Sequence, residues 1–245
     1  MIMAMAVLSA VLFSCVREEM TCDKELIVVQ RIGEGGYVYT RGAAISSNTD
    51  LKEETFGLYG SLTPNASVPQ PYFNASATVN ADLTATISPL QYWPGLLNAS
   101  MKFFSWYPYN DANAPTASFT DPGEMVLNYT ANASAANHVD VLAAISGPVW
   151  VEGVNIHFYH TLTKVTFTFK KVAPVPDEVI IEKIEFQNVG KSGKLAMTEI
   201  PTTTTKNGKP KFVWSDVATG KVVSTLTDNK TVTEDATLMG DTFLM

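Results

Sequence analysis

Apolar and polar side chains alternate with a period of two along much of the chain. The clearest case is residues 165–170, where Val165, Phe167 and Phe169 alternate with two threonines and a lysine. A period of two places the apolar side chains on one face of a β-strand and the polar side chains on the other. We therefore expect strands that have one buried face and one solvated face.

Similar short segments, rich in β-branched and aromatic residues, recur along the chain between turn signals such as Asp121-Pro122-Gly123. Helical character is expected nowhere except in the short Asn/Ala/Ser stretch 131–140. The pattern predicts an all-β protein with two β-sandwich domains. The expected strands are 24–31, 37–41, 56–59, 79–88, 101–107, 125–129, 139–145, 149–159, 165–170, 178–189, 194–198, 211–214, 221–226 and 237–245.

The composition is that of a folded protein, and the net charge indicates which class of partner is not expected. With 245 residues, of which 46% are hydrophobic and 10% aromatic, the chain can bury one large core or two smaller ones. A chain of this size hides roughly 70% of its unfolded surface. The net charge of −7 and the isoelectric point near 5.0 give no basic patch that could neutralise phosphates, so we do not expect nucleic acid as a partner.

The first fourteen residues form an unbroken apolar run, MIMAMAVLSAVLFS, which is too short to cross a bilayer but has the length of a signal-peptide core. The stretch Leu12-Phe13-Ser14-Cys15 that ends this run resembles the lipobox of bacterial lipoproteins. The resemblance implies that residues 1–14 are removed and that the thiol of Cys15 is acylated, which would hold the chain on the outer membrane. Cys22 has no evident partner, and two cysteines alone cannot form a tetrahedral zinc site.

The glycine-rich stretch 31–42 resembles the phosphate-binding loop of protein kinases, since Gly33, Gly35 and Gly36 precede an aromatic residue and a valine. The sequence contains no VAIK-like lysine, no HRD-type loop and no DFG motif, so the other parts that handle phosphate are missing. We interpret the glycines as the turn of a β-hairpin.

Other patterns also give little support for an enzyme. His157 and His160 lie in an expected strand, where a separation of three places them on opposite faces and argues against a metal pair. We expect His160 to be a buried structural histidine that bonds to the backbone. No Gly-x-Ser-x-Gly elbow is present. A hydrolase with two carboxylates remote in sequence stays an open alternative, but the prediction is a protein without catalytic residues, cofactor or metal.

Three segments carry a resemblance to a known family. They are FFSWYPY at residues 103–109, HVDVLAA at 138–144 and VNIHFYHTLTKVTF at 154–167. In this order, and together with a lipobox, they resemble the fimbrillin-like family of Bacteroidetes surface lipoproteins. The likeness extends from about Glu25 onward.

The resemblance implies a type V pilus subunit, or an associated tip or anchor protein, built from two transthyretin-like β-sandwiches. The last residues, DATLMGDTFLM, end in an apolar run without a turn, so the second sandwich is expected to be incomplete. The implied organisation is a signal peptide (1–14), an N-terminal segment with a removable strand (15–41), an N-terminal β-sandwich (42–160) and a C-terminal β-sandwich (161–245).

In that family a trypsin-like protease removes the first strand, and a strand from a neighbouring subunit fills the groove that it leaves. Arg41, which precedes Gly42, is the candidate cleavage site here, although Arg17 and Arg31 would also suit such a protease. The removable strand is expected within 26–29 or 37–39. The exchange would fail if this strand had partners on both sides in the middle of its sheet, or if it lay outside the sandwich.

The alternative is a surface lipoprotein that binds glycan or host protein without polymerising. Four tryptophans could stack on sugars, although such residues belong more often to the core of a β-sandwich. An exposed row of them would favour this alternative. They are Trp93, Trp106, Trp150 and Trp214.

Overall fold

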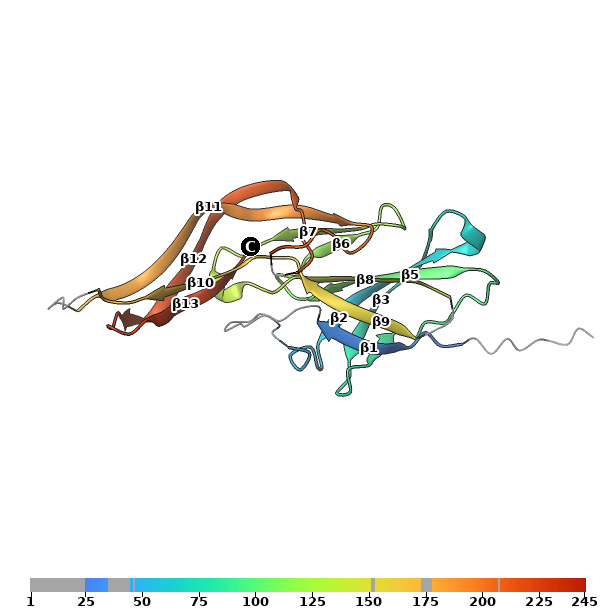
Figure 1. The fold of residues 1–245 in the computed structure, drawn as a ribbon, viewed down its shortest axis with the longest axis horizontal. Helices are drawn as coiled ribbons and strands as arrows, with labels where there is room; N and C mark the ends of the chain where they lie inside the picture. The colour runs from blue at the N-terminus through green and yellow to red at the C-terminus, as the bar shows by residue number, and fades with distance from the viewer. Residues whose placement is uncertain (1–24, 35–44, 46, 151–152, 173–177, 207) are drawn as a thin grey trace, which may run out of the picture.

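The computed structural model describes residues 25–34, 45, 47–150, 153–172, 178–206 and 208–245, which fold into two lobes of β-strands (Figure 1). Among these residues no helix has the length and apolar character needed to cross a membrane. The strands are β1 (Val29–Glu34), β2 (Thr55–Thr63), β3 (Gln70–Val79), β4 (Ala85–Ser88), β5 (Ser100–Tyr107), β6 (Thr116–Ser118), β7 (Met125–Thr130), β8 (Leu142–Val149), β9 (Val154–His160), β10 (Lys164–Phe169), β11 (Ile180–Met197), β12 (Ser215–Thr231) and β13 (Thr237–Leu244).

The first lobe is a closed barrel with the strand order β1-β4-β3-β2-β5-β8-β9. Its neighbours pair antiparallel except β1 and β9, which run parallel and close the ring. In β9 the buried residues Val154, Ile156 and Phe158 alternate with exposed ones, so one face of the strand fills the barrel. Phe158 packs edge-on against Phe56 of β2, with 5.3 Å between ring centroids.

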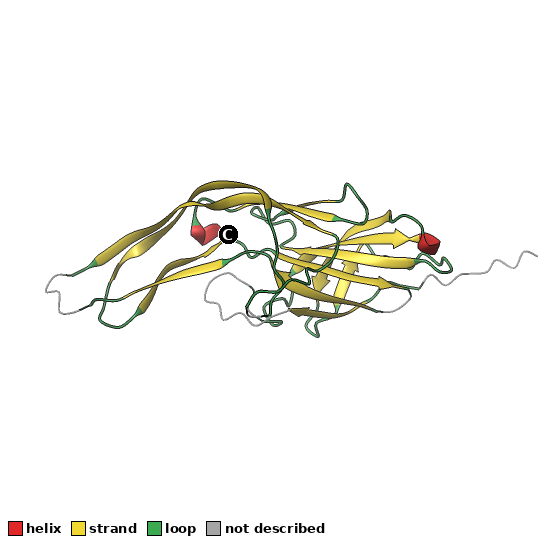
Figure 2. Cartoon of the chain, turned by 45° about the horizontal axis from the view of Figure 1, so that its top comes forward, coloured by secondary structure: helices red, strands yellow, loops and turns green. Residues whose placement is uncertain are grey.

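The second lobe is a sandwich of two sheets (Figure 2). One sheet has the order β12-β11-β7-β6, and the other contains β10 and β13. Their facing sides share a core that includes Val222, Phe243 and Phe167, and the rings of Phe167 and Phe243 lie 5.7 Å apart. The alternation predicted for β10 is present, with its apolar residues turned toward this core and only half-buried.

A third apolar cluster joins the lobes, because β5 is buried on both faces. Met101 and Phe103 of β5 point into the barrel, whereas Phe104 and Trp106 point outward and are covered by residues of β7 and β11. Gly57 of β2 makes room for this contact, since a Cβ atom there would lie 2.1 Å from the Trp106 ring.

The all-β class is confirmed, and most predicted strands are present with shifted ends. The expected helix around 131–140 is only a 3₁₀ turn, η2 (Ala135–Asn137). Strands β3 and β6 were not predicted, residues 211–214 form no strand, and two predicted strands are parts of the single long β11. The expected signal peptide 1–14 and the segment 37–41 lie outside the described residues.

The division into two transthyretin-like domains stays a prediction. The pairing closes the first lobe into a ring, and β6 and β7 precede residue 160 yet share a sheet with β11 and β12. The chain therefore enters the second lobe, returns to the barrel through β8 and β9, and then enters the second lobe again.

The packing of the barrel core predicts how much the free energy of unfolding falls when a buried side chain is truncated. Phe158→Ala removes a side chain that is fully buried, and we expect a loss of about 3–5 kcal/mol in the free energy of unfolding, measured with urea. Val68→Ala is the control, because Val68 is 75% exposed and its truncation should change the free energy little. A loss for Phe158→Ala no larger than that for the control would contradict this packing.

Candidate functional site

The candidate site is the position of residues 25–34, called here the first-strand segment, in the wall of the barrel. On one side the segment runs parallel to β9, with paired residues from Val29 and Val154 to Glu34 and Phe158. The backbone N–H of Val154 also donates to the carbonyl oxygen of Val28 at 2.9 Å. The ladder to β9 is the main backbone attachment of β1.

On the other side the segment meets β4 and the residues around it, with less regular pairing. The only ladder pair with β4 among the described residues joins Val29 and Ala85. Three isolated backbone bonds extend the contact: Ile27 N–H to the Gln91 oxygen at 2.9 Å, Trp93 N–H to the Glu25 oxygen at 2.8 Å, and Ile32 N–H to the Leu83 oxygen at 2.7 Å.

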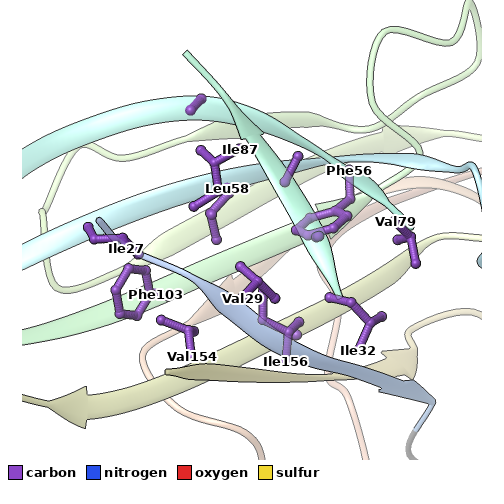
Figure 3. Close-up of a cluster of buried hydrophobic side chains, with 14 of the residues drawn as sticks. Ile27, Val29, Ile32, Phe56, Leu58, Val79, Ile87, Phe103, Val154 and Ile156 are labelled. Carbon is purple, nitrogen blue, oxygen red and sulfur yellow. The ribbon is translucent and has the colours of Figure 1, made fainter. Parts of the chain in front are cut away.

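Three side chains of the segment fill the barrel. Ile27, Val29 and Ile32 are buried, and Figure 3 shows them beside Val154 and Ile156 of β9. A break in the strand register between Val29 and Arg31 explains why Ile32, three residues after Val29, points to the same side. Burial of each side chain stabilises the barrel by about 1.5–3 kcal/mol, so the segment closes the core as well as the ring.

The outward side chains of the segment differ from the inward ones, because they are exposed and include polar residues. Leu26, Val28, Gln30 and Arg31 are exposed. The segment therefore has an apolar inner face and a mixed outer face, as a strand laid into a trough requires.

The structure places the expected removable region 26–29 at this position. The segment has partners on both sides, which the sequence analysis took as an argument against exchange. A segment cut from the chain would nevertheless leave a slot between two strands, and both edges of the slot could bond to a replacement.

The remaining sequence-predicted site residues are not placed. Cys15, Arg41 and Gly42 lie outside the described residues, and so does the alternative region 37–39. Arg31 is described and lies exposed within β1. Acylation at Cys15 and cleavage at Arg41 stay predictions.

The two histidines considered as a metal pair do not form one. His157 is exposed on β9, whereas His160 places Nδ1 2.8 Å from Oδ2 of Asp140. The same carboxylate accepts a bond of 3.1 Å from the backbone N–H of Ile45. The carboxylate of Asp140 is therefore a partner of His160 that the sequence did not predict. In the described part of the chain, no three His, Cys, Asp or Glu residues are grouped to hold a metal ion.

The buried structural histidine is His138, which the sequence analysis did not single out. Its Nδ1 accepts a bond of 2.9 Å from the backbone N–H of Leu244, so its Nε2, 2.9 Å from the carbonyl oxygen of Asn132, carries the proton. This neutral ring connects the loop before β8 to the end of β13. Burial lowers the pKa of His138 from its ordinary value of 6.5.

The tryptophans do not form an exposed row. Trp93 and Trp106 are buried, and Trp214 is half-buried, with its indole N–H donating to the carbonyl oxygen of Thr161 at 2.8 Å. Trp150, which is 60% exposed, is the one large exposed indole in the described ranges.

Comparison with known proteins gives one family and two solved structures. Residues 40–243 match a family model described as fimbrillin-like. No protein of curated function matches the chain. A candidate cell adhesion protein from Bacteroides uniformis is 17% identical, with a TM-score of 0.42 over 83% of this chain and 74% of that chain. A candidate cell adhesion protein from Bacteroides thetaiotaomicron is 11% identical, with a TM-score of 0.33 over 88% of this chain and 85% of that chain.

The environment of His138 predicts a dependence of stability on pH. The unfolded chain takes up a proton on this ring near pH 6.5, whereas the folded chain does so only at lower pH, so stability falls as the pH drops below about 6.5. We expect urea midpoints to fall more for the wild type than for His138→Gln between pH 7.5 and 5. His157→Gln, at an exposed position, should behave as the wild type does. Equal losses in the wild type and His138→Gln would show that His138 does not cause the effect.

Proposed function

Because the chain belongs to the fimbrillin-like family, we propose that it is a structural or adhesive subunit of a bacterial cell-surface fimbria. In this proposal the subunits assemble by strand exchange after proteolytic maturation, and the protein has no catalytic role. The observation that carries the proposal is the first-strand segment, whose buried Ile27, Val29 and Ile32 fill a trough in the barrel.

Export as a lipoprotein accounts for the start of the sequence. The apolar run before Cys15 suits a signal peptide, and the lipobox-like stretch suits acylation of that cysteine. Several acyl chains on one residue hold a protein firmly on a membrane. The proposed location is the outer surface of the cell, first on the outer membrane and then in the fimbria.

The positions of the arginines favour cleavage by an arginine-specific protease in the N-terminal part of the chain only. The sequence contains three of them, Arg17, Arg31 and Arg41, and all precede Gly42. An arginine-specific protease therefore has no target from Gly42 to Met245, whereas lysines are spread over the chain. Cleavage after Arg41 falls between the end of β1 at Glu34 and the start of β2 at Thr55, so it would release the whole first-strand segment.

Release of the segment would leave an apolar slot between β9 and β4. The slot would expose backbone groups on its edges and the apolar residues that Ile27, Val29 and Ile32 now cover. Such an edge is unstable in water and pairs readily with another strand. A strand from a neighbouring subunit with apolar side chains at matching positions would restore both the ladder and the core.

The alternative, a surface lipoprotein that binds a ligand without polymerising, uses the same export but leaves the first-strand segment in place. A polar hollow on the second lobe, lined by residues that include Thr116, Asn128 and Ser192, favours a binding function and is compatible with either architecture.

Cleavage and assembly are predicted to depend on Arg41. Treatment of the folded lipoprotein with an arginine-specific protease should yield a body that begins at Gly42, followed by oligomer ladders that resist mild detergent. Arg41→Gln should give neither product, whereas Arg31→Gln should give both. Peptide mass spectrometry identifies the cut, and gel electrophoresis identifies the ladder. Cutting at Arg31 in the wild type, or a cleaved body that stays monomeric, would refute this route.

The slot is predicted to bind a strand through its inner face. A synthetic peptide of residues 25–34 should bind the cleaved body, and Val29→Asp in the peptide should weaken binding at least a hundredfold, because it replaces a buried methyl pair with a charge. Val28→Asp is the matched control, since Val28 is 45% exposed. Fluorescence anisotropy measures both affinities. Equal weakening by the two changes would mean that the peptide does not bind in the register of the first-strand segment.

A further inference from the structure

The outward face of the second lobe carries rows of polar side chains across three strands. Thr116 of β6 pairs with Asn128 of β7, which pairs with Lys194 of β11. The next row joins Thr130 of β7 to Ser192 of β11. We call these five residues the polar face.

The side chains of this face point away from the core. The alternate residues of the same strands, Ala117, Leu127 and Leu195, pack into the cluster that joins the lobes. Because side chains alternate along a strand, the polar face is the opposite side of the same sheet. Figure 1 shows β6 and β7 beside β11 at the upper side of the molecule.

The polar face is hollowed. Together with a rim from the loop before β6, and with Asn132 and Asp216, it lines a depression of about 560 Å³. This volume lies within the range of about 300–1,000 Å³ that is typical of small-molecule sites. The rim is ordered by a bond of 2.9 Å from the Asn132 amide nitrogen to the Asn113 amide oxygen.

Four polar side chains of the hollow have unused hydrogen-bonding groups. Within the described part of the chain, the side chains of Thr116, Asn128, Thr130 and Ser192 make no hydrogen bond to protein. Three hydroxyl groups and one amide offer donors and acceptors together. A ligand covered with hydroxyl groups could therefore bond to them in both directions.

The charges in the hollow cancel. Lys194 Nζ lies 2.9 Å from Oδ2 of Asp216, and these are the only charged groups among the lining residues. The hollow is therefore poorly suited to an anion such as a phosphate or a sulfated chain. It also lacks the large apolar anchors that a protein partner needs at the centre of an interface.

A smaller apolar hollow of about 250 Å³ lies on the other side of the sheet, where Trp214 and Leu162 pack against the cluster that joins the lobes. A ligand on the polar face would therefore meet its hydroxyl and amide groups and not the Trp214 indole.

We propose that the polar face binds a neutral oligosaccharide. The inference deepens the proposed surface role by naming the ligand class, and it rests on that role for its biological setting only. The binding itself depends on the residues of the second lobe and does not require strand exchange.

The test uses the purified chain and a panel of immobilised oligosaccharides, some neutral and some carrying sialic acid or sulfate. We expect the chain to bind at least one neutral member. The combined variant Thr116→Val, Asn128→Ala and Thr130→Val should bind that member at least about tenfold more weakly, because three hydrogen-bonding groups are lost. Valine has the same β-branched shape as the threonine that it replaces, so both strands should still form. Asn74→Ala, at an exposed position on β3, is the control and should bind as the wild type does.

Three results would overturn the inference: no bound oligosaccharide, binding of acidic members only, or full affinity in the combined variant. Thermal melting confirms that the variant is folded. The combined variant should still form ladders after cleavage at Arg41, because the slot lies in the barrel. A failure of assembly with intact sugar binding, or the reverse, therefore separates this inference from the proposed function.

Discussion

The parallel pairing of β1 with β9 is the contact on which the rest of the barrel depends. Every other neighbour pair in the ring is antiparallel, and many of these pairs are joined by short connections. Among the residues that the structure describes, only the first-strand segment bridges β9 and β4 and covers the core at that point. Since one segment supplies both the last ladder and part of the core, its presence decides whether the barrel is closed.

The other six strands of the barrel are also paired with one another. Strands β4, β3, β2, β5, β8 and β9 remain paired in sequence without β1. β5, in the middle of that series, is anchored on its outer face, where Phe104 and Trp106 pack against the sheet of the second lobe. Apolar burial on two faces holds β5 more firmly than one face could. A body without the segment would keep these contacts of β5, as the proposed strand exchange needs.

Local patterns predicted those parts of the fold that contain a clear period of two. β9 and β10 show the alternation directly, and both were predicted. β3 was not, because Pro71, Asn74 and several small residues hide its buried positions Phe73, Ala75 and Ala77. Sequence alone could not show that β1 pairs parallel with β9, since that contact joins residues more than a hundred positions apart. His138 was missed for the same reason, since its partner Leu244 lies 106 residues further along the chain.

The position of the polar face has a consequence for a subunit of an assembly. The slot lies in the barrel between β9 and β4, whereas the polar face lies on β6, β7 and β11 of the second lobe. The two surfaces share no residue, so a neighbour's strand could fill the slot without occupying the hollow. They are nevertheless connected through one packed cluster, in which Phe104 and Trp106 of the barrel contact the inner side of the sheet that carries the polar face. The outer face of the barrel packs against the inner side of that sheet. The first-strand segment, or its replacement, completes the barrel core, and this packing therefore also stabilises the proposed binding surface.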